Sequence, residues 1–423
     1  MKSERVSFGE ALKVWARIGL LSFGGPAAQI ALMHRVLVDE RKWLSEERFL
    51  HALNFCMLLP GPEAMQLATY AGWCLHGLRG GLTAGLLFVL PGALVVLALS
   101  MLYVALGSVP MIGALFFGIK AAVLAIVVEA LLRVSRRALQ RQSDWLIAAA
   151  AFLALYVFAV PFPVIILAAA VMGFFRSAGE PFQPPPLRIR FAETLLTLAV
   201  WLALWFLPVA LILLAFGPDH VFAGIAVFFS KLAVMTFGGA YAVLSYMAQE
   251  AVQARGWLTT GEMVDGLGLA ETTPGPLILV IEYVAYLSAH RFAGGVWGGI
   301  AGAAIALWVT FVPCFLWIFA FAPYLDYLRS MSRLSGALAA ITAAVVGVIL
   351  NLSIWFALHV LFEKVTRVTW PPFDIWLPDL TSVNLLSLLL SVAAAFMLLK
   401  LDLGVVRTIL ISALAGFVSN FLL

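Results

Sequence analysis

Four short motifs rich in glycine and proline stand inside apolar segments of the chain. They are Phe23-Gly24-Gly25-Pro26, Pro60-Gly61-Pro62, Phe237-Gly238-Gly239-Ala240 and Pro274-Gly275-Pro276, near the middles of segments 8–36, 45–76, 222–250 and 259–290. Proline removes a backbone donor and clashes with the preceding turn, so a helix breaks there. The helix that starts after a break offers free N–H groups and the positive end of its dipole. Such ends suit anions.

The same motifs have a simpler interpretation, because glycine and proline also allow close packing or a kink in membrane helices. Broken backbone at membrane depth is tolerated only where protein or a water-filled cavity satisfies it. Four breaks at matching places therefore favour a binding site, with Pro26, Pro62 and Pro276 expected at the first positions of new helices. The sequence leaves open whether the interrupted segments cross as broken helices or fold back as re-entrant hairpins.

Two basic residues accompany the breaks. Arg17 and Lys231 each stand six residues before the phenylalanine of a Phe-Gly-Gly motif. A cation inside a membrane segment is costly and usually faces the bundle interior with a partner or substrate. We expect the pair to balance the charge of a dianion, although Arg17 is also placed to snorkel to the interface. Ser22 and Thr236 offer hydroxyl donors to oxyanion oxygens.

These motifs define the predicted substrate site. Its residues are Arg17, Ser22, Phe23, Gly24, Gly25, Pro26, Pro60, Gly61, Pro62, Lys231, Thr236, Phe237, Gly238, Gly239, Thr272, Thr273, Pro274, Gly275 and Pro276. Three nearby carboxylates, Glu63, Glu271 and Glu282, are candidates for proton coupling, because acidic groups inside membranes often relay protons. Glu63 has the alternative role of stabilising a helix dipole in its first turn.

Arg41, Trp43, Arg255 and Trp257 lie between the interrupted segments of each half. Tryptophan at the headgroups and arginine at phosphates are usual membrane-interface anchors. A gate-lining role is the alternative interpretation of these four residues.

The composition places most of the chain in a membrane. Of 423 residues, 63% are hydrophobic and 11% are charged, whereas roughly a quarter charged is usual for globular domains. Long runs that are apolar on all sides indicate an all-α polytopic bundle and not a β-barrel. Met1 to Arg17 has no signal-peptide core. The sequence shows no HExxH, no GxSxG and no cysteine–histidine grouping, so we expect neither an enzyme nor a metal or other cofactor. The net charge of +4 does not indicate nucleic-acid binding.

The chain contains two related halves. Residues 17–85 match residues 231–299 at a constant offset of 214, and the match resumes later at an offset of 222, where Pro91 pairs with Pro313. Each half ends in two shorter apolar segments, 145–175 and 384–422. We divide the chain into an N-terminal repeat (1–176), a Pro/Arg-rich linker with one extra transmembrane helix (177–218) and a C-terminal repeat (219–423).

The extra apolar segment, 192–216, has no counterpart in the first half. An odd number of crossings between two copies turns the second copy upside down, which gives inverted-topology repeats. Arginine-rich loops should be cytoplasmic, and the rule is met when the loops holding Arg133–Arg141 and Arg176–Arg190 lie inside together with the N-terminus. The loop 363–379 then lies outside. About thirteen crossings are expected if the broken segments span the membrane, and about nine if they are re-entrant.

Four stretches of this sequence resemble the signature segments of the chromate ion transporter family, in its long form with two homologous halves. They are Ser-Phe-Gly-Gly-Pro-Ala-Ala (22–28), Leu-Pro-Gly-Pro-Glu-Ala-Met-Gln-Leu-Ala-Thr-Tyr (59–70), Thr-Phe-Gly-Gly-Ala-Tyr-Ala-Val-Leu (236–244) and Glu-Thr-Thr-Pro-Gly-Pro-Leu (271–277). The resemblance implies export of chromate from the cytoplasm, driven by the membrane potential or a proton gradient, and hence chromate resistance. Ala240 stands where the first half has Pro26, so the two halves cannot supply identical anion contacts.

Other readings of the function stay open. Sulfate is a tetrahedral dianion like chromate, so sulfate is a second expected substrate or competitor, and a sulfate or other small-anion transporter or an anion channel is the alternative. We expect alternating access around a midplane site, in a bacterial-type inner (plasma) membrane, with the lipid bilayer as surroundings. The sequence leaves a homodimer open.

Overall fold

Helices form almost all of the protein in the computed structural model, which describes residues 6–107, 109–177, 191–237, 240–325, 327 and 331–422. The chain divides into two compact units. The first unit holds residues 1–101, 181–240 and 273–331, and the second holds residues 102–180, 241–272 and 332–423. Each unit therefore combines segments from both sequence halves. The predicted helical membrane class is confirmed.

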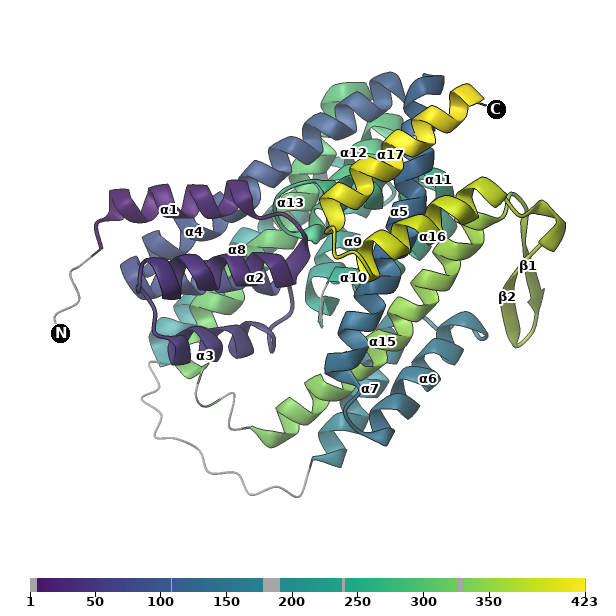
Figure 1. Cartoon of the computed structure of the whole chain (residues 1–423). Helices are drawn as coiled ribbons and strands as arrows, with labels where there is room; N and C mark the ends of the chain where they lie inside the picture. The colour runs from purple at the N-terminus through teal and green to yellow at the C-terminus, as the bar shows by residue number, and fades with distance from the viewer. Residues whose placement is uncertain are drawn as a thin grey trace. The chain divides into compact units, whose positions relative to one another are not determined.

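The first unit contains the short N-terminal helices and several long ones (Figure 1). Its elements are α1 (Phe8–Leu21), α2 (Gly25–His34), the π-helix η1 (Arg35–Glu40), α3 (Glu46–Cys56), most of α4 (Glu63–Leu106), α8 (Phe191–Phe216), α9 (Val221–Met235), η3 (Leu277–Leu279), α12 (Val280–Phe292), α13 (Gly295–Phe321) and η4 (Ala322–Tyr324). Helix α4 is kinked where His76 and Gly77 leave helical geometry. Ser7 and Ser45 cap α1 and α3 through their hydroxyls, as serine commonly does at a helix start.

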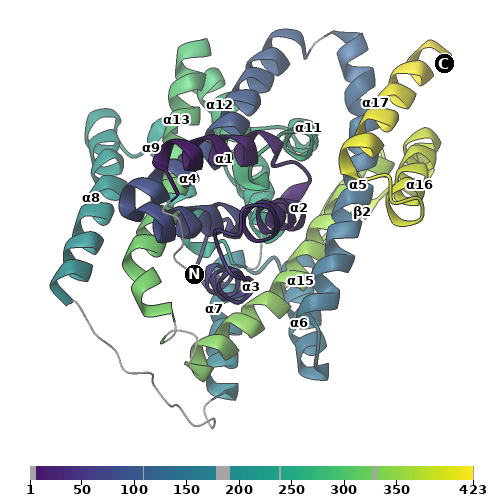
Figure 2. The same ribbon diagram turned by 60° about the vertical axis from the view of Figure 1, so that its left-hand side comes forward.

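The second unit contains the remaining helices and one hairpin. Its elements are α5 (Pro110–Ala138), α6 (Gln142–Tyr156), α7 (Phe162–Arg176), α10 (Ala240–Ala248), the π-helix η2 (Gln249–Ala254), α11 (Thr260–Thr272), α15 (Ser332–Leu361), β1 (Val365–Trp370), β2 (Phe373–Pro378), η5 (Leu380–Ser382), α16 (Leu385–Leu399) and α17 (Val405–Leu422). Helix α5 of the first half packs against α16 and α17 of the second half, and α15 packs against α6 and α7. Both views show α16 and α17 beside α5 (Figures 1 and 2).

Small residues allow these helices to approach closely. A Cβ on Gly118 would collide with the carbonyl oxygen of Ser412, and one on Gly347 would collide with that of Ala148. Because glycine has no Cβ, the backbones of neighbouring helices come into contact at these points. The two halves thus exchange their terminal helix pairs within the second unit.

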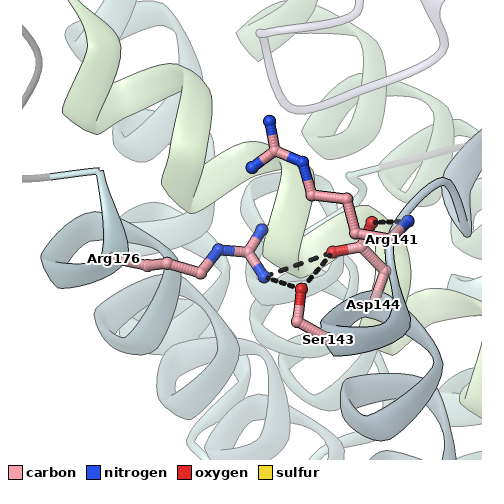
Figure 3. A network of polar contacts seen from close by, with 4 residues as sticks. All are labelled: Arg141, Ser143, Asp144 and Arg176. Atoms are coloured by element: carbon pink, nitrogen blue, oxygen red, sulfur yellow. Dashed lines mark hydrogen bonds and ion pairs between the residues drawn. The ribbon is translucent and has the colours of Figure 1, made fainter.

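Helices α6 and α7 form an antiparallel pair whose basic ends lie together. Arg176, at the end of α7, donates from Nη1 to the Ser143 hydroxyl at 2.9 Å and to Asp144 Oδ1 at 3.2 Å, at the start of α6 (Figure 3). The backbone N–H of Arg141 donates to the other carboxylate oxygen of Asp144 at 3.0 Å. Arg141 and Arg176 are therefore at one end of this pair, as predicted. Arg188 and Arg190 lie outside the described residues.

Five helical stretches within the described part of the chain are long and apolar enough to cross a membrane. They are α4, α5, α8, the stretch Gly295–Tyr324 and α15. Helices α7, α9 and α16 and the stretch Val405–Ser419 of α17 are apolar but shorter. Helices α1, α2 and α3 have 14, 10 and 11 residues, fewer than the about 20 that a straight crossing needs. The predicted extra apolar segment is α8.

The helix breaks occur at the four predicted places. Helix α1 stops before Ser22, α3 before Met57, α9 before Thr236 and α11 before Thr273. Pro26 lies in the first turn of α2, as predicted, whereas Pro62 directly precedes α4 and Pro276 caps η3.

The π-helices match as well. Residues 35–40 and 249–254 are related by the offset of 214. Arg41 N–H donates to Val36 O at 3.0 Å, and Arg255 N–H donates to Glu250 O at 2.9 Å, in the same pattern. The sequence repeat is therefore also a repeat of local backbone geometry.

Strands β1 and β2 are the non-helical element of the second unit. They pair antiparallel, from Val365 opposite Pro378 to Trp370 opposite Phe373. These strands lie in the stretch 363–379, which was expected to be a loop. Alternating Val, Thr and Trp residues favour strand structure, and the first half has no matching segment between α5 and α6.

Candidate functional site

Two backbone hydrogen bonds in the first unit join the helix breaks of one half to those of the other. The N–H of Gly275 donates to the carbonyl oxygen of Ser22 at 2.8 Å, and the N–H of Gly61 donates to that of Thr236 at 2.7 Å. The offset of 214 relates Ser22 to Thr236 and Gly61 to Gly275, so the two bonds are equivalent. We call them the Ser22 junction and the Thr236 junction. They bring all four predicted breaks into one unit.

Each junction begins at the C-terminal cap of a helix. Ser22 caps α1 and Thr236 caps α9, and both are buried. The Ser22 hydroxyl donates to Ile18 O at 2.6 Å, and the Thr236 hydroxyl donates to Leu232 O at 2.7 Å. In this conformation both hydroxyl groups donate to the preceding helix turn and are not available to donate to a ligand. The carbonyl oxygens of the two residues form the junctions.

The donor of each junction is a glycine in a left-handed conformation. Gly61 has φ of 121° and Gly275 has φ of 90°. A residue with a side chain would be strained there by about 1–3 kcal/mol. Both donors are flanked by prolines, which supply no N–H, so each Pro-Gly-Pro motif presents a single backbone donor to the opposite half.

Two buried glutamines, neither of which belongs to the predicted site, form hydrogen bonds at the junctions. Gln29 Nε2 donates to Gly275 O at 2.6 Å and to Ser22 O at 3.2 Å, so its side chain ties both partners of the Ser22 junction together. Gln66 Nε2 donates to Pro60 O at 2.7 Å, beside Gly61. The Oε1 atoms of both side chains are buried without a hydrogen-bond partner within the described residues. The sequence feature that could have identified Gln29 and Gln66 is a polar amide side chain inside an apolar segment.

A second pair of equivalent residues lies behind the junction glycines. A Cβ on Gly92 of α4 would collide with the carbonyl oxygen of Pro274, so this glycine permits direct backbone contact at the Ser22 junction. The offset of 222 places Cys314 of α13 at the matching position. A Cβ on Gly61 would come within 3.0 Å of its Sγ. The Thr236 junction is thus packed against a side chain, and the Ser22 junction against backbone.

The predicted cations face outward from the helices that carry them. The Arg17 side chain is 54% exposed and forms an ion pair with Glu40 of η1, Nη1 to Oε2 at 3.6 Å. Lys231 on α9 is also exposed and makes no ion pair with the described residues. Arg17 therefore has an acidic partner in its own half, and the role of Arg17 and Lys231 in balancing a dianion's charge stays a prediction.

The three carboxylates occupy different surroundings. Glu63 is half-buried as the first residue of α4. Glu282 on α12 is 1% exposed, and its Oε2 atom has no hydrogen-bond partner within the described residues. Glu271 lies in the second unit, where its Oε1 accepts a hydrogen bond from the Tyr241 hydroxyl at 2.7 Å. The candidates thus separate into two in the first unit and one in the second.

The four gate or interface candidates make local contacts. Arg41 donates to Glu10 Oε1 at 2.7 Å, and Trp43 contacts the ring of Trp15. In the second unit, Arg255 donates from Nε to Glu250 Oε1 at 2.9 Å and lies over the ring of Trp257, 4.9 Å from its centroid.

The remaining predicted site residues form the turns around the junctions. Phe23 N–H donates to Leu21 O, and Phe237 N–H donates to Met235 O, in equivalent turns. Gly24 and Gly25 have positive φ and begin α2, whose N-terminus has no side-chain cap. Thr273, Pro274 and Pro276 are buried beside Gly275, and the Thr272 hydroxyl donates to Leu269 O. Gly238 and Gly239 lie outside the described residues.

The second unit contains a buried polar cluster of Asp265, Lys120 and Tyr103 that was not predicted from the sequence. Asp265 of α11 is 6% exposed; its Oδ1 lies 3.2 Å from Lys120 Nζ of α5, and its Oδ2 accepts from the Tyr103 hydroxyl at 2.9 Å. An acidic residue inside an apolar run was the available signal. The described part of the chain contains no group of three His, Cys, Asp or Glu side chains that could hold a metal ion.

Comparisons with known proteins agree with the motifs. A family model described as "Chromate transporter" matches residues 9–174 and 223–417, which is most of both halves. The chain is 34% identical over 373 residues to a chromate transport protein of Pseudomonas aeruginosa, covering 86% of this chain and 84% of that protein. It is 30% identical over 337 residues to a chromate transport protein of Cupriavidus metallidurans, covering 79% and 78%. A probable chromate transport protein of Synechococcus elongatus is 28% identical over 349 residues, 81% of this chain and 83% of that protein. No solved structure matches the chain.

Proposed function

Because the chain belongs to the chromate transporter family, and is therefore a multi-pass membrane transport protein and not an enzyme, we propose that it moves chromate across the membrane. Its relatives in Pseudomonas aeruginosa and Cupriavidus metallidurans carry the name chromate transport protein. Efflux from the cytoplasm is the proposed direction. Sulfate, which has the same tetrahedral shape and charge, is the proposed competing substrate.

The observation that carries the proposed mechanism is the pair of equivalent hydrogen bonds at the two junctions. A dianion is proposed to bind beside them, at the uncapped start of α2 and the starts of the helices that follow the other breaks. Helix N-termini attract anions through free N–H groups and the dipole. Arg17 and Lys231 are proposed to balance the dianion's charge when the substrate is bound.

Alternating access is proposed to arise from the two halves being inverted copies. A duplicated structure is supported by three features: the helix breaks lie at equivalent positions, the π-helices match, and the terminal helices of each half pack against the other half. The odd helix α8 between the copies supports the inversion. The proposed setting is a bacterial-type inner membrane with a cytoplasmic N-terminus, where basic residues are favoured.

Coupling is proposed to use the membrane potential or a proton gradient, with Glu282, Glu63 and Glu271 as the proton-carrying candidates. Glu282 is favoured, because its buried Oε2 atom has no partner within the described residues and intramembrane carboxylates commonly relay protons. An anion channel is the alternative function; it would conduct without coupling to a gradient.

Flux in reconstituted vesicles tests this function. Chromate and sulfate uptake is measured with and without a pH gradient, and with and without a membrane potential. We expect chromate uptake that an imposed gradient accelerates and that sulfate inhibits. Uptake of neither anion under any gradient would overturn the transport function. Rapid uptake that only follows the anion's own electrochemical gradient would favour the channel.

A further inference from the structure

A polar cavity lies in the second unit, whereas both junctions belong to the first. Its walls come from the ends of α6 and α15, from α10 and η2, and from the β1–β2 hairpin. Its volume is about 50 Å³, several times the roughly 10–15 Å³ that one water requires. The hairpin closes one side, because Asp374 N–H donates to Val157 O at 2.9 Å and the Tyr156 hydroxyl donates to Trp376 O at 3.3 Å.

Uncommitted polar side chains line this cavity. Gln249 and Gln253 of η2 and Asn351 of α15 form no side-chain hydrogen bond with the described residues. Ser245, 7% exposed, also lines the wall without such a bond. The π-helix places Gln249 and Gln253 in the same wall. Amide and hydroxyl groups that are not engaged with the protein are free to bind a polar ligand in the cavity.

The charged groups of the wall favour an anion. Arg367 donates from Nε and Nη2 to the two oxygens of Asp374 at 2.7 and 2.5 Å, and its guanidinium lies 5.7 Å from the ring centroid of Trp376. Among the described residues that line the cavity, this pair supplies the only charges, and its positive and negative charges compensate each other. The indole N–H of Trp355, a donor-only group, is buried without a partner within the described residues. Guanidinium and indole groups can only donate, and the amide groups of Gln249, Gln253 and Asn351 add further N–H donors to the wall.

We propose that this cavity is a second oxyanion site, which binds a tetrahedral dianion such as sulfate or chromate through Arg367 and the amides of Gln249, Gln253 and Asn351. The ligand class rests on the proposed oxyanion transport, whereas the binding surface rests on the cavity alone. In the first half, Arg35, Asp39 and Glu129 stand at the positions of Gln249, Gln253 and Asn351. The neutral donor set therefore belongs to the second half alone.

Equilibrium binding of radiolabelled sulfate to the purified full chain in detergent tests the site. The double variant Gln249→Ala/Asn351→Ala and the variant Arg367→Gln should each weaken one class of sulfate binding by about tenfold or more, as expected for lost hydrogen bonds to a charged ligand. Asp374→Asn should strengthen it several-fold, because the guanidinium loses its competing carboxylate. Gln142→Ala and Arg333→Gln are matched controls outside the cavity and should bind like the wild type.

The outcomes separate this proposal from the transport function. Wild-type sulfate binding that none of the cavity variants changes would overturn the second site while leaving transport untouched. Weaker binding in Asp374→Asn than in the wild type, at a temperature where hydrogen exchange shows that the weakened hairpin is still folded, would also overturn it. If the wild type neither binds nor transports sulfate or chromate, the proposed function itself fails.

Discussion

The Ser22 and Thr236 junctions share one backbone hydrogen bond but differ in what surrounds it. At the Ser22 junction, Gln29 bonds both partners, and Gly92 allows the backbone of α4 to touch Pro274. At the Thr236 junction no glutamine bridges the two partners within the described residues; Gln66 bonds Pro60 and the Cys314 thiol, and Cys314 supplies the packing. The first junction is therefore fixed by more contacts than the second.

The contrast between the two junctions shows that the two halves share the backbone hydrogen bond but not the side chains around it. The Gly–carbonyl bond is present in both halves, whereas Val243 and Val280 stand where the first half has Gln29 and Gln66. The glutamine hydrogen bonds at both junctions thus come from the first half. We infer that the Thr236 junction is the one that opens more easily during transport.

The largest expected effect comes from adding one methyl group at Gly92. In Gly92→Ala the Cβ meets the Pro274 carbonyl oxygen, and backbone on both sides cannot give way. Overpacking of this kind costs typically about 1–3 kcal/mol and should displace Gly275 from Ser22. We expect chromate uptake in vesicles to fall by about tenfold or more.

Cys314→Ala is the matched change at the Thr236 junction. It removes a sulfur atom and adds nothing, so uptake should stay within about twofold of the wild type while stability falls slightly. Equal losses in Gly92→Ala and Cys314→Ala would show that the two junctions are packed alike.

The next effect concerns Glu282, which has no acidic counterpart in the first half, where Ala68 stands. In Glu282→Gln the side chain keeps its shape and loses the ability to exchange a proton. We expect the acceleration of uptake by a pH gradient to disappear, with thermal stability unchanged or higher. Glu63→Gln is the comparison, because Glu63 lies half-buried at a helix start and should mainly affect the helix dipole. Normal gradient dependence in Glu282→Gln would remove Glu282 from the coupling.

The positions of the breaks could be predicted from sequence because proline and glycine act locally. The reciprocal pairing of Gly61 with Thr236 could not, since it depends on how distant segments fold together. The roles of Gln29, Gly92 and Asp265 could not be predicted for the same reason, because each residue contacts a partner that is far away in sequence. The ion pair between Arg17 and Glu40 could not be predicted either, because the two residues belong to different helices.

A smaller effect distinguishes the two glutamines. Gln29→Leu leaves Gly275 O without its side-chain donor and removes one of two donors to Ser22 O, whereas Gln66→Leu affects Pro60 O and the weakly bonding Cys314 thiol but neither partner of the Thr236 junction. An unsatisfied buried group costs about 1–3 kcal/mol. Both variants should unfold at lower temperature in detergent, with Gln29→Leu the less stable. The reverse order would contradict the tighter Ser22 junction.

The smallest expected effect is a pH dependence confined to the β1–β2 hairpin, which the first half lacks. The hydrogen bond from Arg367 lowers the pKa of Asp374 below its usual value, which is about 3.9 in unfolded chains. A carboxyl group with a lowered folded pKa stabilises the fold above the unfolded pKa, and this stabilisation is lost as the pH falls through the folded value. Hydrogen exchange of residues 365–378, corrected for intrinsic rates, should therefore show constant protection from about pH 8 to 5 and a loss below about pH 4. Asp374→Asn should weaken protection at neutral pH and abolish the acid-dependent loss, while α16 and α17 stay protected. Protection in the wild type that declines between pH 7 and 5 would mean that a group other than this ion pair holds the hairpin.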